Sequence, residues 1–201
     1  MFTIAPASSA DVPAAASVLA SAFENDTVMG TLVAGAHRRS RLAQLFRALM
    51  RAGALRTGRV DLTRRDTDGG LLGAAIWEPP GQHASLLAQA RELPSFIRAL
   101  GWSGLGRAIR IQSTLADHRP AEPHWYLAQI GVGAEARGLG VGSALLESRL
   151  KKIDADGLPS YLEASNDRNR ALYSRYGFES IGSIEGIPNA SPAAMWRPAQ
   201  R

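Results

Sequence analysis

The stretch ARGLGVGSALLESRL, residues 136–150, places three alternating glycines directly before a helical pattern. A glycine-rich turn at the start of a helix leaves backbone N–H groups free, and the helix dipole favours negative charge at that end. Glycine also lacks the Cβ atom that would keep a phosphate away from the backbone. We therefore predict an anion-binding loop at Arg137 to Ser143, followed by a helix over about 140–154.

Two common phosphate loops fit this stretch poorly. A P-loop requires a lysine directly before its serine or threonine, and no lysine precedes Ser143. A dinucleotide-binding turn requires G-x-G-x-x-G straight after a strand, with an acidic residue about 20 residues further on. Glu163 falls at such a distance, but the glycines here run G-x-G-x-G and residues 133–137 separate them from the preceding apolar strand. The dinucleotide interpretation is therefore disfavoured.

The composition is that of an ordinary soluble globular domain. The chain has 201 residues, of which 45% are hydrophobic and 20% charged. It contains no cysteine, which excludes disulfides, thiolate metal sites and a cysteinyl acyl-enzyme, so we expect a cytoplasmic protein without a metal. We find no run of about 18 apolar residues and no signal-peptide pattern, so we expect no membrane association.

The charge balance is basic, with a formal net charge of +5. Nucleic acid is the first partner that such a balance suggests. The arginines are dispersed, however, and the densest groups, at 37–41 and 63–66, are short and lack interleaved aromatic residues. We therefore expect an arginine-rich solvated surface and no nucleic-acid partner, although a positive field also attracts a small polyanionic ligand.

Hydrophobic spacing and turn residues predict the order of the elements. We predict strands at Ile4, 59–64, 71–78, 123–132, 158–164, 178–184 and 193–197, and helices after Ser9, from about Arg38, within 84–116 (bent or broken by Pro94 and glycines), over 140–154 and after Asn166. Ser165 or Asn166 can cap the last helix, and Gly177 can end it. The order β-α-α-β-β-α-β-α-β-α-β-β indicates one α/β domain with a mixed sheet.

Several motifs together point to a family. Arg137, Gly140 and Gly142 match the fixed positions of Q/R-x-x-G-x-G/A. The strand YLEAS follows, and then N-x-x-N-x-x-x-Y-x-x-x-G-F, carried by Asn166, Asn169, Tyr173, Gly177 and Phe178. Over about 125–180 the chain resembles the GNAT superfamily of acyl-CoA-dependent N-acetyltransferases. Within that family, residues 10–23 and 118–180 resemble puromycin N-acetyltransferase and its relatives.

The resemblance implies a single N-acetyltransferase domain over 1–201, with the α/β (α+β) fold of that family. Its sheet is expected to be mixed and mostly antiparallel, with about six to seven strands flanked by helices and a splayed central strand pair. The cofactor-binding core is expected at about 123–184 and the acceptor-side region at about 20–117. The implied cofactor is acetyl-CoA, and we expect a monomer or homodimer.

The resemblance also implies a reaction: transfer of the acetyl group to a primary amine, by direct attack in a ternary complex. We expect the amine to belong to a small molecule. A protein N-terminus or lysine is a second option for the acceptor, and a non-catalytic acyl-CoA sensor is a third interpretation of the chain.

The expected cofactor contacts come from three segments. They are Ile130, Gly131 and Val132 at the end of a strand, Arg137, Gly138, Leu139, Gly140, Val141, Gly142 and Ser143 in the loop, and Asn166, Asn169 and Tyr173 on the short helix. Gly131 and Gly133 suit an irregular strand, or they simply end it. Arg137 binds the ligand or braces the loop, and the asparagines contact the cofactor or cap the helix.

Two residues are expected to move protons. Tyr173 occupies the position of the family's tyrosine acid, and its spacing puts it on one helix face with Asn166 and Asn169, leaving Leu172 and Tyr176 for the core. A tyrosine with a pKa of about 10 protonates the thiolate of a thiol with a pKa of about 8.5 at a cost of about 2 kcal/mol. Glu163 is the first candidate base, and a structural salt bridge is its competing role.

Further candidates are weaker. His118 and His124 are alternative bases, although a lone loop histidine is more often a surface or hydrogen-bonding residue. Phe23, Asp26, Trp77 and Trp125 are candidates for acceptor binding. The tryptophans are expected in the core or in a pocket wall, and Trp125 is favoured for the wall. The acidic residues near residue 26 either attract an ammonium group or form a solvated helix end.

Overall fold

The computed structural model describes residues 1–56, 59–82 and 86–200. Residues 57–58, 83–85 and 201 therefore lie outside the described residues, and with them small parts of the predicted acceptor-side region and the first residues of the predicted helical segment 84–116. None of the helices in the described ranges combines the length and the apolarity that a membrane span requires.

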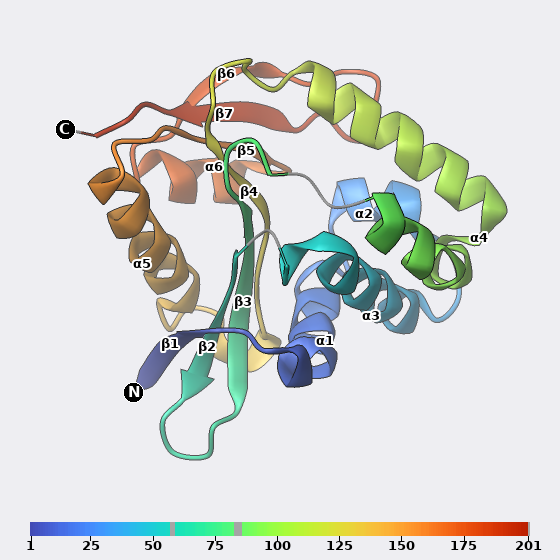
Figure 1. The fold of residues 1–201 in the computed structure, drawn as a ribbon, viewed down its shortest axis with the longest axis horizontal. Coiled ribbons are helices and arrows are strands. Elements are labelled where there is room, and N and C mark those ends of the chain that lie inside the picture. Colours follow the sequence, from blue (N-terminus) through green and yellow to red (C-terminus); the bar gives the residue numbers. More distant parts are fainter. Residues whose placement is uncertain (57–58, 83–85, 201) are drawn as a thin grey trace.

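One mixed sheet of seven strands forms the centre of the molecule (Figure 1). The strands are β1 (Phe2–Pro6), β2 (Arg59–Arg65), β3 (Leu71–Glu78), β4 (Trp125–Val132), β5 (Ser160–Ala164), β6 (Glu179–Ser183) and β7 (Ala193–Arg197). Their order in the sheet is β1-β2-β3-β4-β5-β7-β6. All neighbours are antiparallel except β4 and β5, which are parallel. This confirms the predicted mixed, mostly antiparallel sheet.

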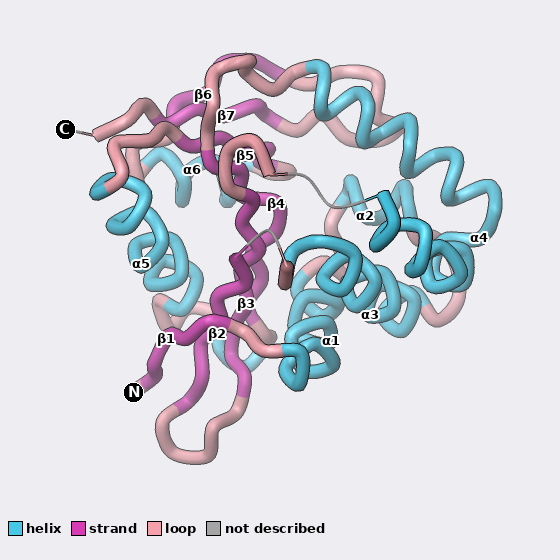
Figure 2. The backbone as a smooth tube through the Cα atoms, in the orientation of Figure 1, coloured by secondary structure: helices cyan, strands magenta, loops and turns pink. Residues whose placement is uncertain are grey.

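Helices cover both faces of this sheet. They are α1 (Val12–Ala22), α2 (Thr27–Leu32), α3 (Arg38–Leu49), α4 (Leu86–Asp117), α5 (Val141–Ala155) and α6 (Asp167–Ser174), with short turns η1 (Ser9–Asp11), η2 (Met50–Ala54) and η3 (Ala134–Ala136). The helices α1 to α4 lie on one side of the central strands, and α5 lies on the other (Figures 1 and 2).

The structure adds to the sequence analysis in two helical segments. The six-residue helix α2 was not predicted; Asp26 caps it, its side chain accepting the N–H of Met29. The segment within 84–116, labelled α4, consists of two helices that meet at a kink: the break falls at Gly101, whose φ of 72° and ψ of 169° are not helical, and Pro94 lies inside the first of them.

The central strand β4 carries two irregularities. Its pairing with β3 shifts between Ile76 and Trp77, so that Ala128 has no partner of its own and forms a bulge. Its pairing with β5 covers only Trp125–Leu127 against Ser160–Leu162, so β4 runs on without β5 beside it. This is the splayed central pair that the resemblance implies.

Close packing of helices on the central strands depends on two glycines. A Cβ atom at Gly131 of β4 would lie 2.7 Å from the Cβ of Ala22, and one at Gly73 of β3 would lie 2.8 Å from Cγ1 of Val141. The helices α1 and α5 therefore press on adjacent strands. Gly131 lies in the part of β4 that has no β5 beside it, as expected for the irregular strand, and it also makes room for α1.

A buried ion pair ties α5 to the sheet. Arg149 of α5 donates from Nε and Nη2 to the two carboxylate oxygens of Asp61 of β2, at 2.9 and 2.6 Å. Both residues are buried, so the pair is largely shielded from solvent and salt. Together with the contact of Val141 at Gly73, it fixes α5 at both its N-terminal and its C-terminal half.

Candidate active site

The loop before α5 is left-handed at two glycines and open on its outer side. Gly138 and Gly140 have φ values of 83° and 78°, in the region that favours glycine. A Cβ atom at either position would meet no protein atom within 4 Å. These glycines therefore face space that a ligand can fill.

The same loop presents unsatisfied donors. Gly140 is the N-cap of α5, so the N–H groups of Val141, Gly142 and Ser143 have no acceptor within the helix. Leu139 beside them is 63% exposed. The exposed side chain of Arg137 forms no ion pair or hydrogen bond with the described residues, so it makes no bracing contact to the loop there. The loop thus has the N–H groups, the dipole and the cation that an anion site needs.

The open edge of β4 lies next to this loop. Gly133 donates its N–H to the carbonyl oxygen of Leu72 at 2.8 Å. Hydrogen bonds alternate along an antiparallel pair, so Gly131 also directs its N–H toward β3, whereas Ile130 and Val132 direct theirs to the opposite edge. That is the edge from which β5 has diverged. Of the three predicted strand residues, two therefore carry free N–H donors.

Tyr173 lies in the last turn of α6 and is only 5% exposed. The assignment of Leu172 and Tyr176 as the core-facing pair was incomplete, because Tyr173 itself lies in the apolar cluster against which those two residues pack. Tyr173 is the buried residue of α6, and those two are only partly buried. Gly177, with φ of 83°, reverses the chain so that Phe178 packs edge-on against Tyr173, with ring centroids 6.1 Å apart.

The surroundings of Tyr173 keep it protonated. Burial raises the pKa of its hydroxyl well above the ordinary value of 10.0, and the Asp26 carboxylate raises it further. The Asp26 carboxylate thus acts electrostatically on Tyr173, although the two residues are far apart in the sequence. A raised pKa makes the tyrosine a weaker acid, and each unit adds about 1.4 kcal/mol to the cost of donating its proton.

The two asparagines of α6 have different surroundings. Asn166 caps the helix, because its side-chain oxygen accepts the N–H of Asn169 at 2.9 Å. Asn166 therefore has a capping role in this structure. The residue is also exposed to solvent. Asn169 is half-buried one turn before Tyr173.

Glu163 is the first residue of β5 beyond its pairing with β4, and its side chain is 8% exposed. Its Oε2 accepts a hydrogen bond from the Tyr126 hydroxyl at 2.6 Å. Its Oε1 lies 3.5 Å from Nε of Arg119. Burial raises the pKa of this carboxyl, and Arg119 and the hydrogen bond from Tyr126 act in the opposite direction. Glu163 thus forms the salt bridge that was its competing role, with Arg119 as its partner. It is also buried, as suits a base.

Sequence reasoning missed the two partners of Glu163. Tyr126 lies opposite Tyr161 in the parallel β4–β5 register, so strand alternation places Tyr126, Tyr161 and Glu163 on one face of the sheet. That alternation was the available signal. Arg119 lies in an irregular segment, 44 positions from Glu163, and its loop carries no pattern that predicts the contact.

The two histidines have packing or surface positions, as expected for histidines that do not act as a base. His124 packs edge-on against Tyr161 and Trp196, with ring centroids 5.6 and 5.5 Å apart, and burial lowers its pKa. His118 is exposed, and its Nδ1 lies 2.8 Å from the carbonyl oxygen of Thr114.

The weaker acceptor candidates divide into two groups. Phe23 ends α1, packs on Phe46 at 5.5 Å and borders Gly131, so it lies beside the open part of β4. Trp77 is fully buried, and Trp125 is nearly so. Both belong to the apolar cluster beneath α5 rather than to the cluster that contains Tyr126 and Tyr161. Core packing is therefore their role, and the expectation that Trp125 lines an acceptor pocket is corrected.

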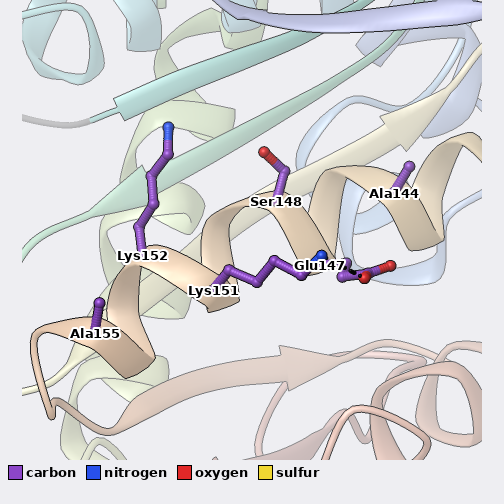
Figure 3. A pocket seen from close by; sticks show the side chains of 6 residues that line it. All are labelled: Ala144, Glu147, Ser148, Lys151, Lys152 and Ala155. Atoms are coloured by element: carbon purple, nitrogen blue, oxygen red, sulfur yellow. Dashed lines mark ion pairs between the residues drawn. The ribbon is translucent and has the colours of Figure 1, made fainter.

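A shallow depression on the outer face of α5 contains none of the predicted site residues. It is lined by Ala144, Glu147, Ser148, Lys151, Lys152 and Ala155 (Figure 3). Glu147 and Lys151 form an i,i+4 ion pair across it, with 2.9 Å between Oε1 and Nζ. This is a solvated helix face.

Comparison with known proteins identifies a family for the segment that contains this site. Residues 77–178, about half of the chain, match the model of the acetyltransferase (GNAT) family. That segment spans β4, the glycine loop, α5, β5 and α6, and so contains Glu163, Tyr173 and Arg119.

Two curated relatives match over short segments. An uncharacterised N-acetyltransferase of Schizosaccharomyces pombe is 40% identical over 60 residues, which cover 30% of this chain and 24% of that protein. Mycothiol acetyltransferase of Propionibacterium freudenreichii is 26% identical over 91 residues, which cover 44% of this chain and 29% of that protein. The chain thus spans less than a third of either relative.

A solved structure matches throughout. The crystal structure of "histone acetyltransferase HPA2 and related acetyltransferase" from Corynebacterium glutamicum is 29% identical, with a TM-score of 0.80. The match covers 100% of this chain and 97% of that one.

Proposed function

Because the chain belongs to the acetyltransferase (GNAT) family, we propose that it transfers the acetyl group of acetyl-CoA to a primary amine on a small molecule, by direct attack in a ternary complex. One observation carries the proposal. The edge of β4 that β5 leaves open lies between the glycine loop and the Glu163 carboxylate. We therefore assign three groups along this edge: loop N–H groups that bind the pyrophosphate, strand N–H groups that bind the thioester carbonyl, and the carboxylate that acts as the base.

The loop supports cofactor binding. The N–H groups of Val141, Gly142 and Ser143, the dipole of α5 and the exposed Arg137 suit the pyrophosphate of coenzyme A. Acetyl-CoA, when bound, supplies the acetyl group as a thioester. Gly138 and Gly140 leave room above the loop, since nothing in the described chain occupies it.

The free N–H groups of Ile130 and Val132 support stabilisation of the carbonyl oxygen as negative charge develops on it. Backbone donors held in a sheet are fixed before the reaction, so they need no reorganisation during it. Removing one such donor in other enzymes costs on the order of 10²- to 10³-fold in rate.

Glu163 and Tyr173 are the proposed proton carriers. Glu163 removes a proton from the ammonium form of the acceptor, directly or through water, so that the nitrogen lone pair can attack. Tyr173 donates its hydroxyl proton to the departing thiolate, and the second proton that the nitrogen loses as the amide forms restores the tyrosine, directly or through water. Its raised pKa makes the donation more costly than the roughly 2 kcal/mol expected for an unperturbed tyrosine.

The acceptor class rests on charge. Asp26 and Glu163 are both acidic, and Asp26 is close enough to Tyr173 to affect its pKa. Such acids favour a cationic amine. Mycothiol acetyltransferase is a relative whose name gives a small-molecule acceptor, which supports the first choice. The name of the full-length structural match, a histone acetyltransferase, favours a protein amine as the second candidate.

Turnover over an amine panel tests the proposal. Coenzyme A release is measured with acetyl-CoA and with aminonucleosides, amino acids, polyamines and lysine-containing peptides, and the N-acetyl product is identified by mass. We expect amine-dependent release with a small molecule. Release with peptides alone would favour the protein acceptor. Tight acetyl-CoA binding without release for any amine would favour a non-catalytic acyl-CoA sensor.

A further inference from the structure

We propose that Arg119 is a positioning residue that holds the Glu163 carboxylate in place and in its negatively charged form. This inference rests on the proposed function of Glu163 as the base. Arg119 follows the last turn of α4, the long helix on the acceptor side, and it reaches across to β5. It would therefore act on the reaction through Glu163, without touching either substrate.

The geometry around Arg119 is well defined. The centre of its guanidinium group lies 3.7 Å from the centroid of the Tyr126 ring. Its Nε lies 3.5 Å from Oε1 of Glu163, and its side chain is 20% exposed. The Tyr126 hydroxyl holds the other oxygen, Oε2, at 2.6 Å. Stacking on the ring fixes the guanidinium plane, and the two contacts fix both carboxylate oxygens.

The carboxylate needs this cation because it is buried. A buried carboxylate takes up a proton unless an opposite charge or hydrogen bonds favour its ionised form. The groups that face Glu163 are Tyr126 from β4, Tyr161 from β5 and Arg119 from the segment after α4. Glu78 at the end of β3 acts on Arg119 and Tyr126, and Arg119 itself lowers the pKa of the neighbouring His124. Among these described groups, Arg119 is the permanent cation.

A base must be unprotonated before it can accept a proton. Without Arg119, burial would dominate, and the pKa of Glu163 would rise further from its ordinary value. A larger fraction of the protein would then carry a protonated Glu163 near neutral pH. The consequence is a shift in the pH dependence of the enzyme, which a purely structural contact would not produce.

The test compares three variants by carboxyl titration. Arg119→Met keeps the bulk that packs on Tyr126 and removes the charge, and Arg119→Lys restores a charge. Arg51→Met is the matched control, because Arg51 also pairs with a glutamate, Glu92, at 3.0 and 2.9 Å, but on a different part of the molecule. The ¹³C carboxyl shift of Glu163 is followed against pH and assigned by its loss in Glu163→Gln.

We expect Arg119→Met to raise the pKa of Glu163 by about one to three units, the range that an opposite charge within about 4–6 Å produces. Arg119→Lys should return the pKa toward the wild-type value, and Arg51→Met should leave it unchanged. The acidic limb of kcat/KM should move to higher pH by the same amount in Arg119→Met, while the affinity for acetyl-CoA stays the same.

An unchanged Glu163 pKa in Arg119→Met would overturn the proposal. If the same variant also had a lowered melting temperature, the role of Arg119 would be structural only. If Arg119→Met does not fold, Arg119→Gln serves for the same titration. The titration needs no turnover, so it decides the role of Arg119 even if no amine is acetylated. Absence of turnover in the wild type would instead reject the proposed function.

Discussion

Leu127 of β4 lies opposite Leu162 of β5, and it is the last residue of β4 that pairs with β5 in the described sheet. One position further, Glu163 turns its carboxylate to the Tyr126 hydroxyl. On the other strand, Ile130 and Val132 keep free N–H groups as β4 runs on toward the glycine loop. The divergence of two strands therefore creates both the proposed cofactor path and the position of the proposed base.

Replacement of Tyr173 with phenylalanine should lower kcat by about 10²- to 10⁴-fold, since it removes the proton that the thiolate needs. The dissociation constant for acetyl-CoA, measured by calorimetry, should change little. Tyr176→Phe is the matched control, because Tyr176 is a partly buried tyrosine that follows α6, and it should keep full turnover. An unchanged kcat in Tyr173→Phe would remove Tyr173 as the acid.

The raised pKa of Tyr173 also predicts the alkaline behaviour. The tyrosine remains protonated beyond its ordinary value of 10.0, because burial and Asp26 both oppose ionisation. Loss of its proton should therefore cause no fall in kcat below about pH 10. Replacement of Asp26 with asparagine should leave the profile flat below that value as well. A tyrosine titration seen by ultraviolet difference spectra below pH 10, absent in Tyr173→Phe, would contradict this.

Replacement of Gly140 with valine should abolish acetyl-CoA binding, because a side chain would occupy the space above the loop. Gly157→Val is the control at the other end of α5. Gly140 and Gly157 have φ of 78° and 63°, and a Cβ at either would meet nothing within 4 Å. Both changes should lower stability, by at least about 1–2 kcal/mol for the left-handed backbone. Retained affinity in Gly140→Val would refute the loop assignment.

Replacement of Glu163 with glutamine should reduce kcat/KM by about 10²- to 10⁴-fold near neutral pH if Glu163 is the base. In the wild type, kcat/KM should rise with pH through the pKa of Glu163, which burial raises above its ordinary value of 4.5. That acidic limb should disappear in the variant. Full turnover with reduced thermal stability would instead show that the salt bridge with Arg119 is the only role of Glu163.

Replacement of Arg149 with methionine should lower the free energy of unfolding by about 3–5 kcal/mol, since it leaves the buried Asp61 carboxylate without its cation. The added change Asp61→Asn should recover part of the loss. Lys151→Met breaks an exposed pair on the same helix, with Glu147, and should cost less than about 1 kcal/mol. Urea unfolding measures all three, and equal losses for the two single variants would contradict this account.

The periodic parts of the chain were predictable from sequence. The helix predicted over 140–154 is Val141–Ala155, and the strand predicted at 193–197 has those bounds. Long amphipathic helices and alternating strands carry their burial pattern in local sequence. Helix α2 was missed because its six residues, TVMGTL, are too few for a helical period and include glycine and β-branched residues.

The site was predictable only in part. The glycine loop and the residues Glu163 and Tyr173 follow from motifs, but the side-chain surroundings do not. The direction of Tyr173 is set by Phe178, which packs back on a helix of eight residues after the turn at Gly177. The contact of Arg119 with Glu163 joins an irregular segment to a strand, so no local period records it.

A crystal structure of the protein with coenzyme A tests the central claim most directly, through the distance between the coenzyme A sulfur and the Tyr173 hydroxyl. The account predicts that the sulfur lies beside the open edge of β4, within hydrogen-bond reach of that hydroxyl, with the pyrophosphate on the N–H groups of Val141 to Ser143. A cofactor bound elsewhere, or a sulfur far from Tyr173 with the pyrophosphate off the loop, would contradict it.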